Sequence, residues 1–258
     1  IRDSPVPNAS RDTYDFNINA SLNATDKLTI YAALNARVQS TDNYVSSGYS
    51  SLQSNFSQWW QRQLDMDRLR DNYQFEGAFY TWNRRSARNA RPQYWDAPHY
   101  EQYQNTNQNK NSTYSGNFGL NYDIIDGLSA NVEVRRRAYN RTNWGRGFIG
   151  QNTLSTQASY NEGSYTTEMN EVIAKLDYNT RITDDLDLTA IVGYGAGQNK
   201  TISTSASTSG GLAIPDFYTI ANSVDKPNYS TGRYNQSRLS AYSLISVSYT
   251  HLRAHETE

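Results

Sequence analysis

The sequence has no cysteine among its 258 residues and no long run of hydrophobic residues. Without cysteine there can be no disulfide framework and no thiolate-ligated zinc or iron–sulfur site. A membrane-spanning helix needs about 18 or more consecutive apolar residues, so the sequence predicts none. Neither sign of charge dominates, with 24 Lys and Arg against 25 Asp and Glu. The overall charge therefore gives no reason to expect nucleic acid as a partner.

Hydrophobic residues are also scarce, at 36% of the chain, below the roughly 45–50% of a typical soluble domain. Low hydrophobicity often indicates disorder, but disordered chains are poor in aromatic residues. Here aromatic residues make up 13% of the chain, including 21 tyrosines. A wide transmembrane β-barrel explains both features, because its lumen is polar, its outside is an apolar band and aromatic girdles mark the two interfaces.

The strongest pattern in the sequence is an alternation of apolar and polar residues with a period of two, which is typical of strands. It occurs on both sides of three short turns that contain Asp, a residue that hydrogen-bonds its own backbone in turns. The pattern predicts hairpins at about 13–38, 116–138 and 170–197, and a further strand from about 237. Each predicted strand has roughly the ten residues that a tilted membrane strand needs.

The connections between these hairpins are long, at 39–114, 143–167 and 199–236. Short turns on one side and long loops on the other are typical of transmembrane barrels. The sequence therefore predicts an all-β fold: an antiparallel transmembrane β-barrel segment of about seven strands with long extracellular loops. A soluble antiparallel sandwich with one polar face is the alternative that periodicity leaves open.

The parity of the alternation also predicts which side chains face lipid and which face the lumen. The residues expected to face lipid are Leu28, Ile30, Leu34, Val132, Val134, Leu188, Ala190 and Val192. The residues expected to face the lumen are Asn17, Asn19, Asn121, Glu133 and Asp187.

Several strings resemble segments of one transporter family. The strings are Gln58–Asp67, Tyr80–Asn83, Pro92–Pro98, Gly116–Asp123, and Gly211–Tyr218 followed by Asn222. Their order and spacing, between about Arg11 and Tyr242, resemble the SusC/RagA-like TonB-dependent (TonB-linked) outer-membrane transporters of Bacteroidota. The resemblance implies a 22-stranded barrel with an N-terminal plug, of which residues 1–246 would be an internal part.

The same resemblance implies a function in the bacterial outer membrane. It implies uptake of glycans or peptides together with a SusD-like surface lipoprotein, and energy from the TonB complex through a plug region that these residues do not match. Two alternatives remain open. One is a soluble or surface-attached β-sandwich adhesin or carbohydrate-binding module, and the other is a lidless siderophore- or cobalamin-type TonB-dependent receptor.

No catalytic constellation is present, since the sequence has no G-x-S-x-G, P-loop or dinucleotide-binding motif. We therefore expect no enzyme activity, no catalytic or cofactor-binding residue and no cofactor. No metal site is expected either, because His251 and His255 have no third ligand. Loop aromatics are the candidate contacts to substrate or lid, with packing between loops as the alternative. They are Trp59, Trp60, Trp82, Trp95 and Trp144.

Arg136 continues the lipid-facing parity of Val134 although it is charged. It lies about nine residues beyond the Asp126-Gly127 turn, which corresponds to roughly 23 Å along a tilted strand. Because the apolar band is about 25 Å tall, Arg136 is expected at the outer rim, in contact with lipopolysaccharide phosphates. A bulge at 135–137 that turns Arg136 inward is the alternative.

Three further segments carry weaker expectations. Residues 51–70 have helical spacing of apolar residues, with Asp65, Asp67 and Asp71 pairing locally with arginines. The basic residues between Arg84 and Arg91 are expected to form a solvated loop, and His99, shortly after them, is also expected to be solvated. Residues 247–258 do not continue the strand pattern and resemble translated sequencing-adapter read-through, so we expect a non-native tail there.

Overall fold

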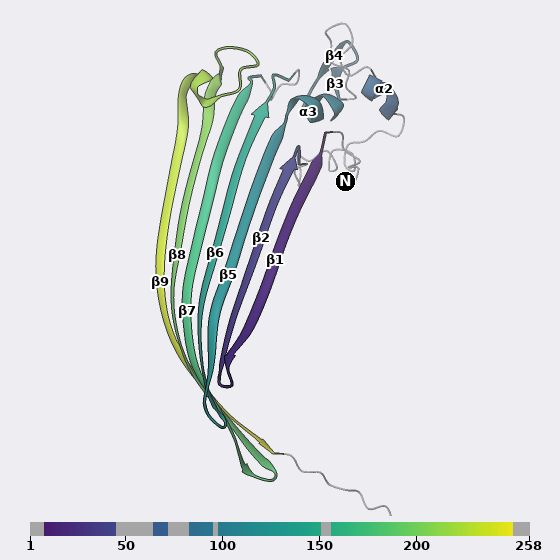
Figure 1. Cartoon of the computed structure of the whole chain (residues 1–258). Helices are drawn as coiled ribbons and strands as arrows, with labels where there is room; N and C mark the ends of the chain where they lie inside the picture. Colours follow the sequence, from purple (N-terminus) through teal and green to yellow (C-terminus); the bar gives the residue numbers. More distant parts are fainter. Residues whose placement is uncertain (1–7, 45–63, 72–82, 95–97, 151–155, 250–258) are drawn as a thin grey trace, which may run out of the picture.

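This computed structural model describes residues 8–44, 64–71, 83–94, 98–150 and 156–249. Most of them form a single antiparallel sheet of seven strands, in which each strand pairs with its neighbours along the chain (Figure 1). The strands are β1 (Ser10–Thr25), β2 (Leu28–Asp42), β5 (Asn107–Ile125), β6 (Leu128–Gly147), β7 (Ser159–Thr183), β8 (Leu186–Leu212) and β9 (Ser223–Tyr249). The predicted all-β fold with seven barrel strands is confirmed.

Three two-residue turns join β1 to β2, β5 to β6 and β7 to β8, and all three lie at the same end of the sheet (Figure 1). Each contains Asp, as predicted: Asp26, Asp126 and Asp184. The second turn also requires glycine, because Gly127 has a φ of +80° and an added Cβ would lie 2.2 Å from the carbonyl oxygen of Asn179. These turns set the register that runs through the whole sheet.

The register separates apolar from polar side chains onto opposite faces. Paired residues share a face, and the single row that contains Ala20, Ala32, Phe118 and Val134 continues through every strand on the same face. The residues predicted to face lipid all lie on this apolar face. The residues predicted to face the lumen all lie on the opposite, polar face.

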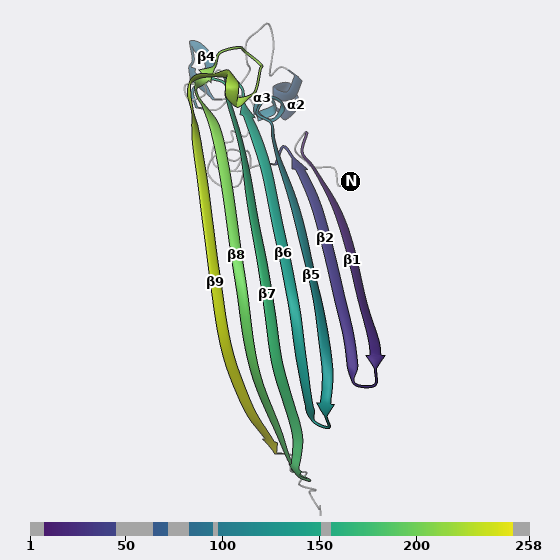
Figure 2. The same cartoon turned by 60° about the vertical axis from the view of Figure 1, so that its left-hand side comes forward.

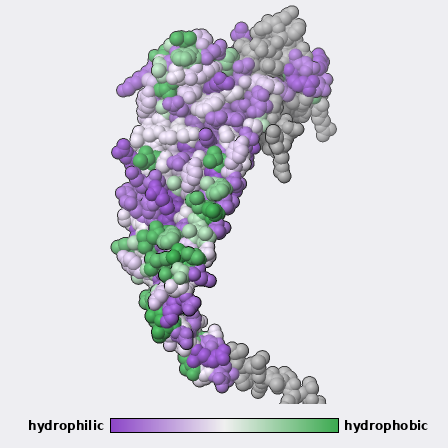
Figure 3. All heavy atoms as spheres, viewed as in Figure 1, coloured by the Kyte–Doolittle hydropathy of each residue, from purple (hydrophilic) through white to green (hydrophobic). Residues whose placement is uncertain are grey.

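The apolar face is uncovered, because the described residues form no second layer over it. Leu239 and Ile245 on β9 remain 72% and 74% exposed. Hydrophobic residues gather in the half of the sheet nearer the tight turns, and the other half is mostly hydrophilic or neutral (Figure 3). The described residues contain no helix that is both long and apolar enough to span a membrane.

The apolar band crosses the sheet at a slant. On β1 it reaches Tyr14, and the register carries that position across the sheet to Arg233 on β9. On β9, however, the band ends at Leu239, six residues nearer the tight-turn end. Six residues of about 3.3 Å over six strand spacings of about 4.8 Å correspond to a tilt of roughly 35°, as in transmembrane barrels. The tight turns step in the same direction (Figure 2).

The strands continue much further from the tight turns than the sequence predicts. Segment 143–167 was expected to be a loop, but β6 runs to Gly147 and β7 begins at Ser159. Segment 199–236 is mostly strand, and β9 begins at Ser223 instead of about 237. Segment 39–114 is also shorter as a loop, because β5 begins at Asn107. These extensions carry Ser, Thr and Asn on both faces, so they lack the alternation of apolar and polar residues by which strands are recognised in a sequence.

The strand pattern also continues beyond 246. Val247 pairs with Leu188 and Tyr249 pairs with Leu186, and both lie on the apolar face. β9 therefore extends three residues past 246, the expected end of the barrel segment, and the non-native origin of residues 247–258 stays a prediction. Residues 250–258 lie outside the described residues.

Short elements lie between β2 and β5 and between β8 and β9. They are α2 (Met66–Asp71), β3 (Arg84–Ser86), β4 (Asn89–Pro92), α3 (Pro98–Gln104) and the 3-10 turn η1 (Ile220–Asn222). The side chain of Asp65 accepts hydrogen bonds from the backbone N–H groups of Asp67 and Arg68 at the start of α2. Arg70 pairs with Asp67 and Asp71, at 2.9 and 3.0 Å, so local pairing is confirmed. Most of the predicted helix, 51–63, lies outside the described residues.

Candidate functional site: the polar face of the sheet

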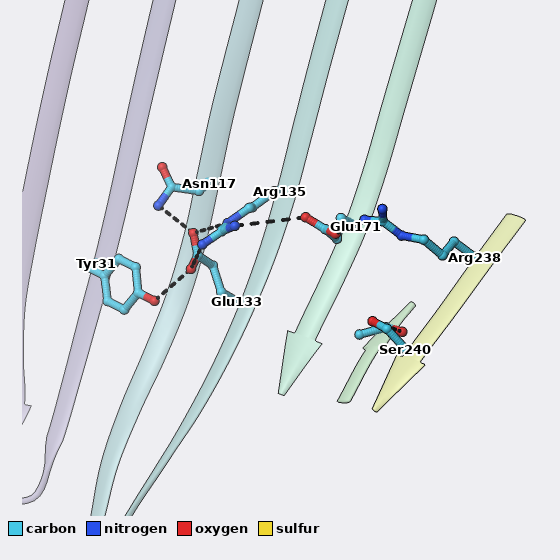
Figure 4. A network of polar contacts seen from close by, with 8 residues as sticks. Tyr31, Asn117, Glu133, Arg135, Glu171, Arg238 and Ser240 are labelled. Atoms are coloured by element: carbon cyan, nitrogen blue, oxygen red, sulfur yellow. Dashed lines mark hydrogen bonds and ion pairs between the residues drawn. The ribbon is translucent and has the colours of Figure 1, made fainter. Parts of the chain in front are cut away.

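The centre of the polar face is a row of three residues on adjacent strands. Tyr31 on β2 pairs with Gly119 on β5, and Gly119 pairs with Glu133 on β6. Because Gly119 has no side chain, the Tyr31 ring lies across β5 and its hydroxyl donates to Glu133 Oε2 at 3.4 Å (Figure 4). A Cβ at Gly119 would lie 2.1 Å from Tyr31 Cζ, so only glycine allows this contact.

Glu133 is the most enclosed carboxylate of this network, with 9% of the residue exposed. Its Oε1 accepts hydrogen bonds from Arg135 Nε and Asn117 Nδ2, each at 2.9 Å, and its Oε2 accepts another from Arg135 Nη2 at 2.9 Å. A buried carboxylate needs such partners to offset its loss of hydration. Glu133 was expected to face the lumen, and it lies on the polar face with its charge fully engaged.

A second glycine, on β8, allows a similar contact three strands further on. Arg135, Glu171, Gly197 and Arg238 form one row across β6, β7, β8 and β9. Arg238 Nη2 donates to Glu171 Oε1 across Gly197, at 3.2 Å, and Arg135 Nη1 lies 3.9 Å from Glu171 Oε2 (Figure 4). Together the two rows connect five strands through polar side chains.

Most charged side chains on this part of the polar face are paired. Five cationic side chains contact five carboxylates, counting Arg37 with Asp15 at 2.5 Å and the Glu133–Arg238 network. The remaining two pairs are Lys175–Asp177 and Arg181–Asp187. No group of three or more His, Asp or Glu residues suited to a metal ion occurs in the part of the chain that the structure describes.

Further from the tight turns, the polar face has a hollow of about 560 Å³. It forms where Gly163 on β7 and serines on β8 leave space between larger neighbours. The residues that line it include Tyr139, Arg141, Asn143, Tyr165, Ser205 and Asn228. The Tyr139 and Tyr165 rings meet edge to face, with centroids 6.1 Å apart. The Tyr139 hydroxyl donates to Asn111 Oδ1 at 3.0 Å, so the two rings are held in place.

Trp144 is the only one of the five candidate loop tryptophans that lies within the described residues. It belongs to β6, and its indole N–H donates to Gln108 Oε1 at 3.2 Å. The Arg146 guanidinium lies 5.8 Å from the Trp144 ring and 5.5 Å from the Tyr218 ring, within range of a cation–π contact. Trp144 therefore packs against its neighbours at this end of the sheet, and its contact with substrate or lid stays a prediction. Trp59, Trp60, Trp82 and Trp95 lie outside the described residues.

The β8–β9 connection is held by Asn222, within a string that supported the family resemblance. Asn222 Nδ2 donates to the carbonyls of Ile214 and Phe217, and its Oδ1 accepts from the Ile214 N–H. Arg146 attaches this connection to β6 through Tyr218. Burial raises the pKa of Tyr218, and the charge of Asp216 adds to the rise. The phenol therefore stays neutral, which suits its contact with the guanidinium.

Arg136 lies on the apolar face, beyond Val134, as the parity predicts. The register of β6 has no shift between Leu128 and Gly147 on its β7 side, so the alternative of a bulge at 135–137 is wrong. Its Nη2 lies 3.8 Å from Glu168 Oε2, and its side chain is 65% exposed. Its contact with lipopolysaccharide stays a prediction.

Two loop expectations have different outcomes. Arg84, Arg85, Arg88 and Arg91 are exposed on the β3–β4 hairpin, so solvation is confirmed, although the segment is a hairpin and not an irregular loop. His99 on α3 was expected to be solvated, but it is half-buried, and its Nε2 is buried without a hydrogen-bond partner among the described residues. Burial, and then the charge of Arg70, lowers the pKa of His99.

Nothing in the sequence alone singles out Tyr31, Gly119 or Arg141. Their positions follow from the register between strands that are far apart in the chain, which the alternation does not fix. One signal was available for Gly119: a glycine inside a strand often marks the close approach of another group.

Comparisons with known proteins support this description of the fold. Neither a protein-family model nor a curated protein matches the chain. Among solved structures, the chain is similar to the RagAB peptide transporter, with a TM-score of 0.62 and 15% identity. It is also similar to the RagAB peptide importer in its open-open state (0.64, 16%) and its closed-closed state (0.61, 14%).

Each of these matches covers 93% of this chain but only 26% of the solved chain. This chain therefore spans about a quarter of the length of the chains that it resembles. At this identity the likeness concerns the fold alone, and the fold is that of an all-β, antiparallel segment of a β-barrel.

Proposed function

We propose that the chain is part of the wall of an outer-membrane, TonB-dependent importer of the SusC/RagA type. In this proposal the protein conducts its substrate across the bacterial outer membrane and is not an enzyme. The observation that carries the proposal is the slanted apolar band on one face of the sheet, backed by a polar face on which ion pairs connect neighbouring strands. A lipid bilayer covers such a band, and a water-filled lumen hydrates such a polar face.

The open edges of the sheet support the same proposal. β1 and β9 each pair with one neighbour among the described strands. An unpaired strand edge cannot remain in lipid, so further strands from the rest of the protein must continue the sheet on both sides. A barrel of about 22 strands, as the sequence resemblance implies, provides them.

The substrate and partners in this proposal follow from the resemblance. The family takes up glycans or peptides, and the likeness to a peptide transporter favours peptides. A SusD-like surface lipoprotein is the proposed partner at the extracellular mouth. The TonB complex is the proposed partner at the periplasmic side, through a plug outside these residues. A lidless siderophore- or cobalamin-type receptor shares the barrel, but the loop strings do not resemble that group.

The test uses the full-length protein that carries this segment, expressed in the outer membrane of a host that lacks its own peptide importers. A fluorescent peptide of about ten residues should accumulate inside the cells, and the accumulation should stop when TonB is deleted. Barrel integrity is checked in parallel by the faster electrophoretic migration of the unheated protein. Accumulation that is unchanged without TonB, or a protein absent from the outer-membrane fraction, would contradict the proposal.

A further inference from the structure

The hollow on the polar face is lined by one cation, Arg141, and one carboxylate residue, Glu162, whose side chain accepts a hydrogen bond from Tyr160 and makes no ion pair with Arg141. Arg141 lies on β6, directly opposite Tyr165 on β7. Its Nε donates to Asn109 Oδ1 at 3.0 Å. No carboxylate oxygen among residues 8–44, 64–71, 83–94, 98–150 and 156–249 lies within 4.0 Å of its guanidinium. Arg141 differs in this respect from the five paired cations nearer the tight turns.

Arg137 adds a second unbalanced charge on the same face of β6, four residues along the strand. The described residues place no carboxylate within 4.0 Å of it either. The cationic end of the polar face is therefore the end away from the tight turns, and it borders the hollow. Unpaired positive charge in a recessed surface raises the local concentration of anions.

We propose that this hollow is a substrate subsite and that Arg141 binds a carboxylate of a transported peptide. The inference rests on the proposed import function and specifies its substrate class as acidic peptides. A guanidinium presents parallel N–H donors that match the two oxygens of a carboxylate. The Nε of Arg141 is engaged by Asn109, which orients the fork, and the terminal nitrogens remain to donate to the ligand.

The rest of the lining suits a peptide main chain. Asn143 and Asn228 offer both amide donors and carbonyl acceptors, and Ser205 offers a hydroxyl. The fixed Tyr139–Tyr165 pair provides an apolar edge against which a side chain can pack. The volume of about 560 Å³ accommodates a few residues of an extended chain. A carboxylate could also come from a uronic-acid glycan, so the test includes both sources.

The experiment measures binding to the full-length protein, purified in detergent, by titration with fluorescent ligands. The ligands are an acidic peptide, a neutral peptide of equal length in which Gln replaces Glu, and an oligogalacturonate. Arg141→Gln should weaken binding of the acidic peptide about tenfold or more, which is the scale of a lost charge-assisted hydrogen bond. Binding of the neutral peptide should stay within about twofold, and Arg141→Lys should restore part of the loss.

Arg136→Gln is the matched control, because it removes the same charge from the same strand on the opposite face. It should leave both peptides unaffected. An equal loss for acidic and neutral peptides after Arg141→Gln would overturn the subsite, since it would indicate a structural role alone. A loss confined to the oligogalacturonate would overturn the assignment to peptides. If the wild-type protein binds the neutral peptide as tightly as the acidic one, the subsite fails while peptide import stands. If it binds neither, both proposals fail.

Discussion

The Tyr31 ring lies against Gly119, so closely that a methyl group on Gly119 would lie 2.1 Å from Tyr31 Cζ. The ring thereby bridges β2 and β6 across the strand that separates them. A similar closeness occurs at Gly193, where an added Cβ would lie 2.1 Å from Tyr242 Cζ. Aromatic side chains that cover strand glycines stabilise sheets and fix their register.

Gly119→Ala should therefore displace Tyr31 and break its contacts with Glu133 and with Asn131, whose Nδ2 donates to the tyrosine hydroxyl at 3.1 Å. We expect a loss of about 1–3 kcal/mol in the free energy of unfolding, the usual cost of overpacking. Urea unfolding of the full-length protein in detergent, followed by tryptophan fluorescence, measures it. Gly116→Ala is the control, because a Cβ there would make an ordinary contact, 3.4 Å from the carbonyl oxygen of Ala33. Equal midpoints for the two variants would contradict the prediction.

Glu133→Gln should destabilise the barrel by about 1–3 kcal/mol, since it leaves Arg135 without its closest carboxylate. Asp15→Asn, which breaks the exposed pair with Arg37, should cost less than about 1 kcal/mol. Both variants are compared by the same urea titration. A larger effect of Asp15→Asn would mean that enclosure of Glu133 does not decide the energetics of the polar face.

Nitroxide labels at neighbouring positions of β8 should report opposite environments in bilayers. A label at Leu188 should be relaxed by oxygen, which partitions into lipid, because this side chain lies in the apolar band. A label at Asp187 should be relaxed by a water-soluble nickel complex, because this side chain lies on the polar face. Electron paramagnetic resonance power saturation measures both effects. The reverse pattern would mean that lipid covers the polar face of the sheet, and it would contradict the prediction.

Arg136→Leu should leave the barrel folded but reduce the lipopolysaccharide that copurifies with the full-length protein. The expected cause is loss of a guanidinium at the rim of the apolar band, where it can bind phosphate. Arg137→Leu is the control, because the adjacent side chain lies on the polar face. Lipopolysaccharide is quantified by a phosphate or endotoxin assay after detergent extraction. Equal retention by wild type and Arg136→Leu would contradict the rim contact.

The 258-residue chain, expressed alone, should aggregate or require detergent. Its apolar band has no covering layer among the described residues, and both edge strands expose unpaired backbone groups. Size-exclusion chromatography with light scattering, in buffer with and without detergent, distinguishes the outcomes. A soluble monomer with a cooperative thermal transition would contradict the barrel and revive the β-sandwich alternative.

The sequence predicted the half of the sheet in which one face is apolar and the other polar. It missed the half in which both faces are polar. Alternation around Leu188 and Val132 fixes both the strands and their faces, because a one-residue error would expose the whole apolar set. No such penalty exists in segments such as Ser203–Ser209, where both faces are polar, so the strands there were taken for loops. Once the half of the sheet nearer the tight turns has set the register, backbone pairing continues into these segments whatever the polarity of their side chains.

The candidate site was less predictable for a related reason. Glu133 could be placed on the polar face by parity, but its partner Tyr31 is 102 residues away in the chain. Arg141 lies in a polar strand extension where nothing distinguishes it from other arginines. Arg141 stands out because no described carboxylate lies close to its guanidinium. Which residues surround it depends on pairings across four strands. Trp144 drew attention as a large aromatic residue, yet its contacts are with Gln108 and Arg146.

The unequal strand lengths give the mouth of the barrel an uneven rim. Beyond the apolar band, β2 continues for four residues past Val38, whereas β8 continues for sixteen past Ala196. With about 3.3 Å per residue and a tilt near 35°, the strands extend roughly 11 Å beyond the apolar band at β2 and roughly 43 Å at β8. A protein that binds over this opening meets long strand extensions on the β8 side and short ones on the β2 side. The long insertion from Asn43 to Thr106 leaves the sheet between β2 and β5. The longest connection therefore lies on the side where the strand extension is short.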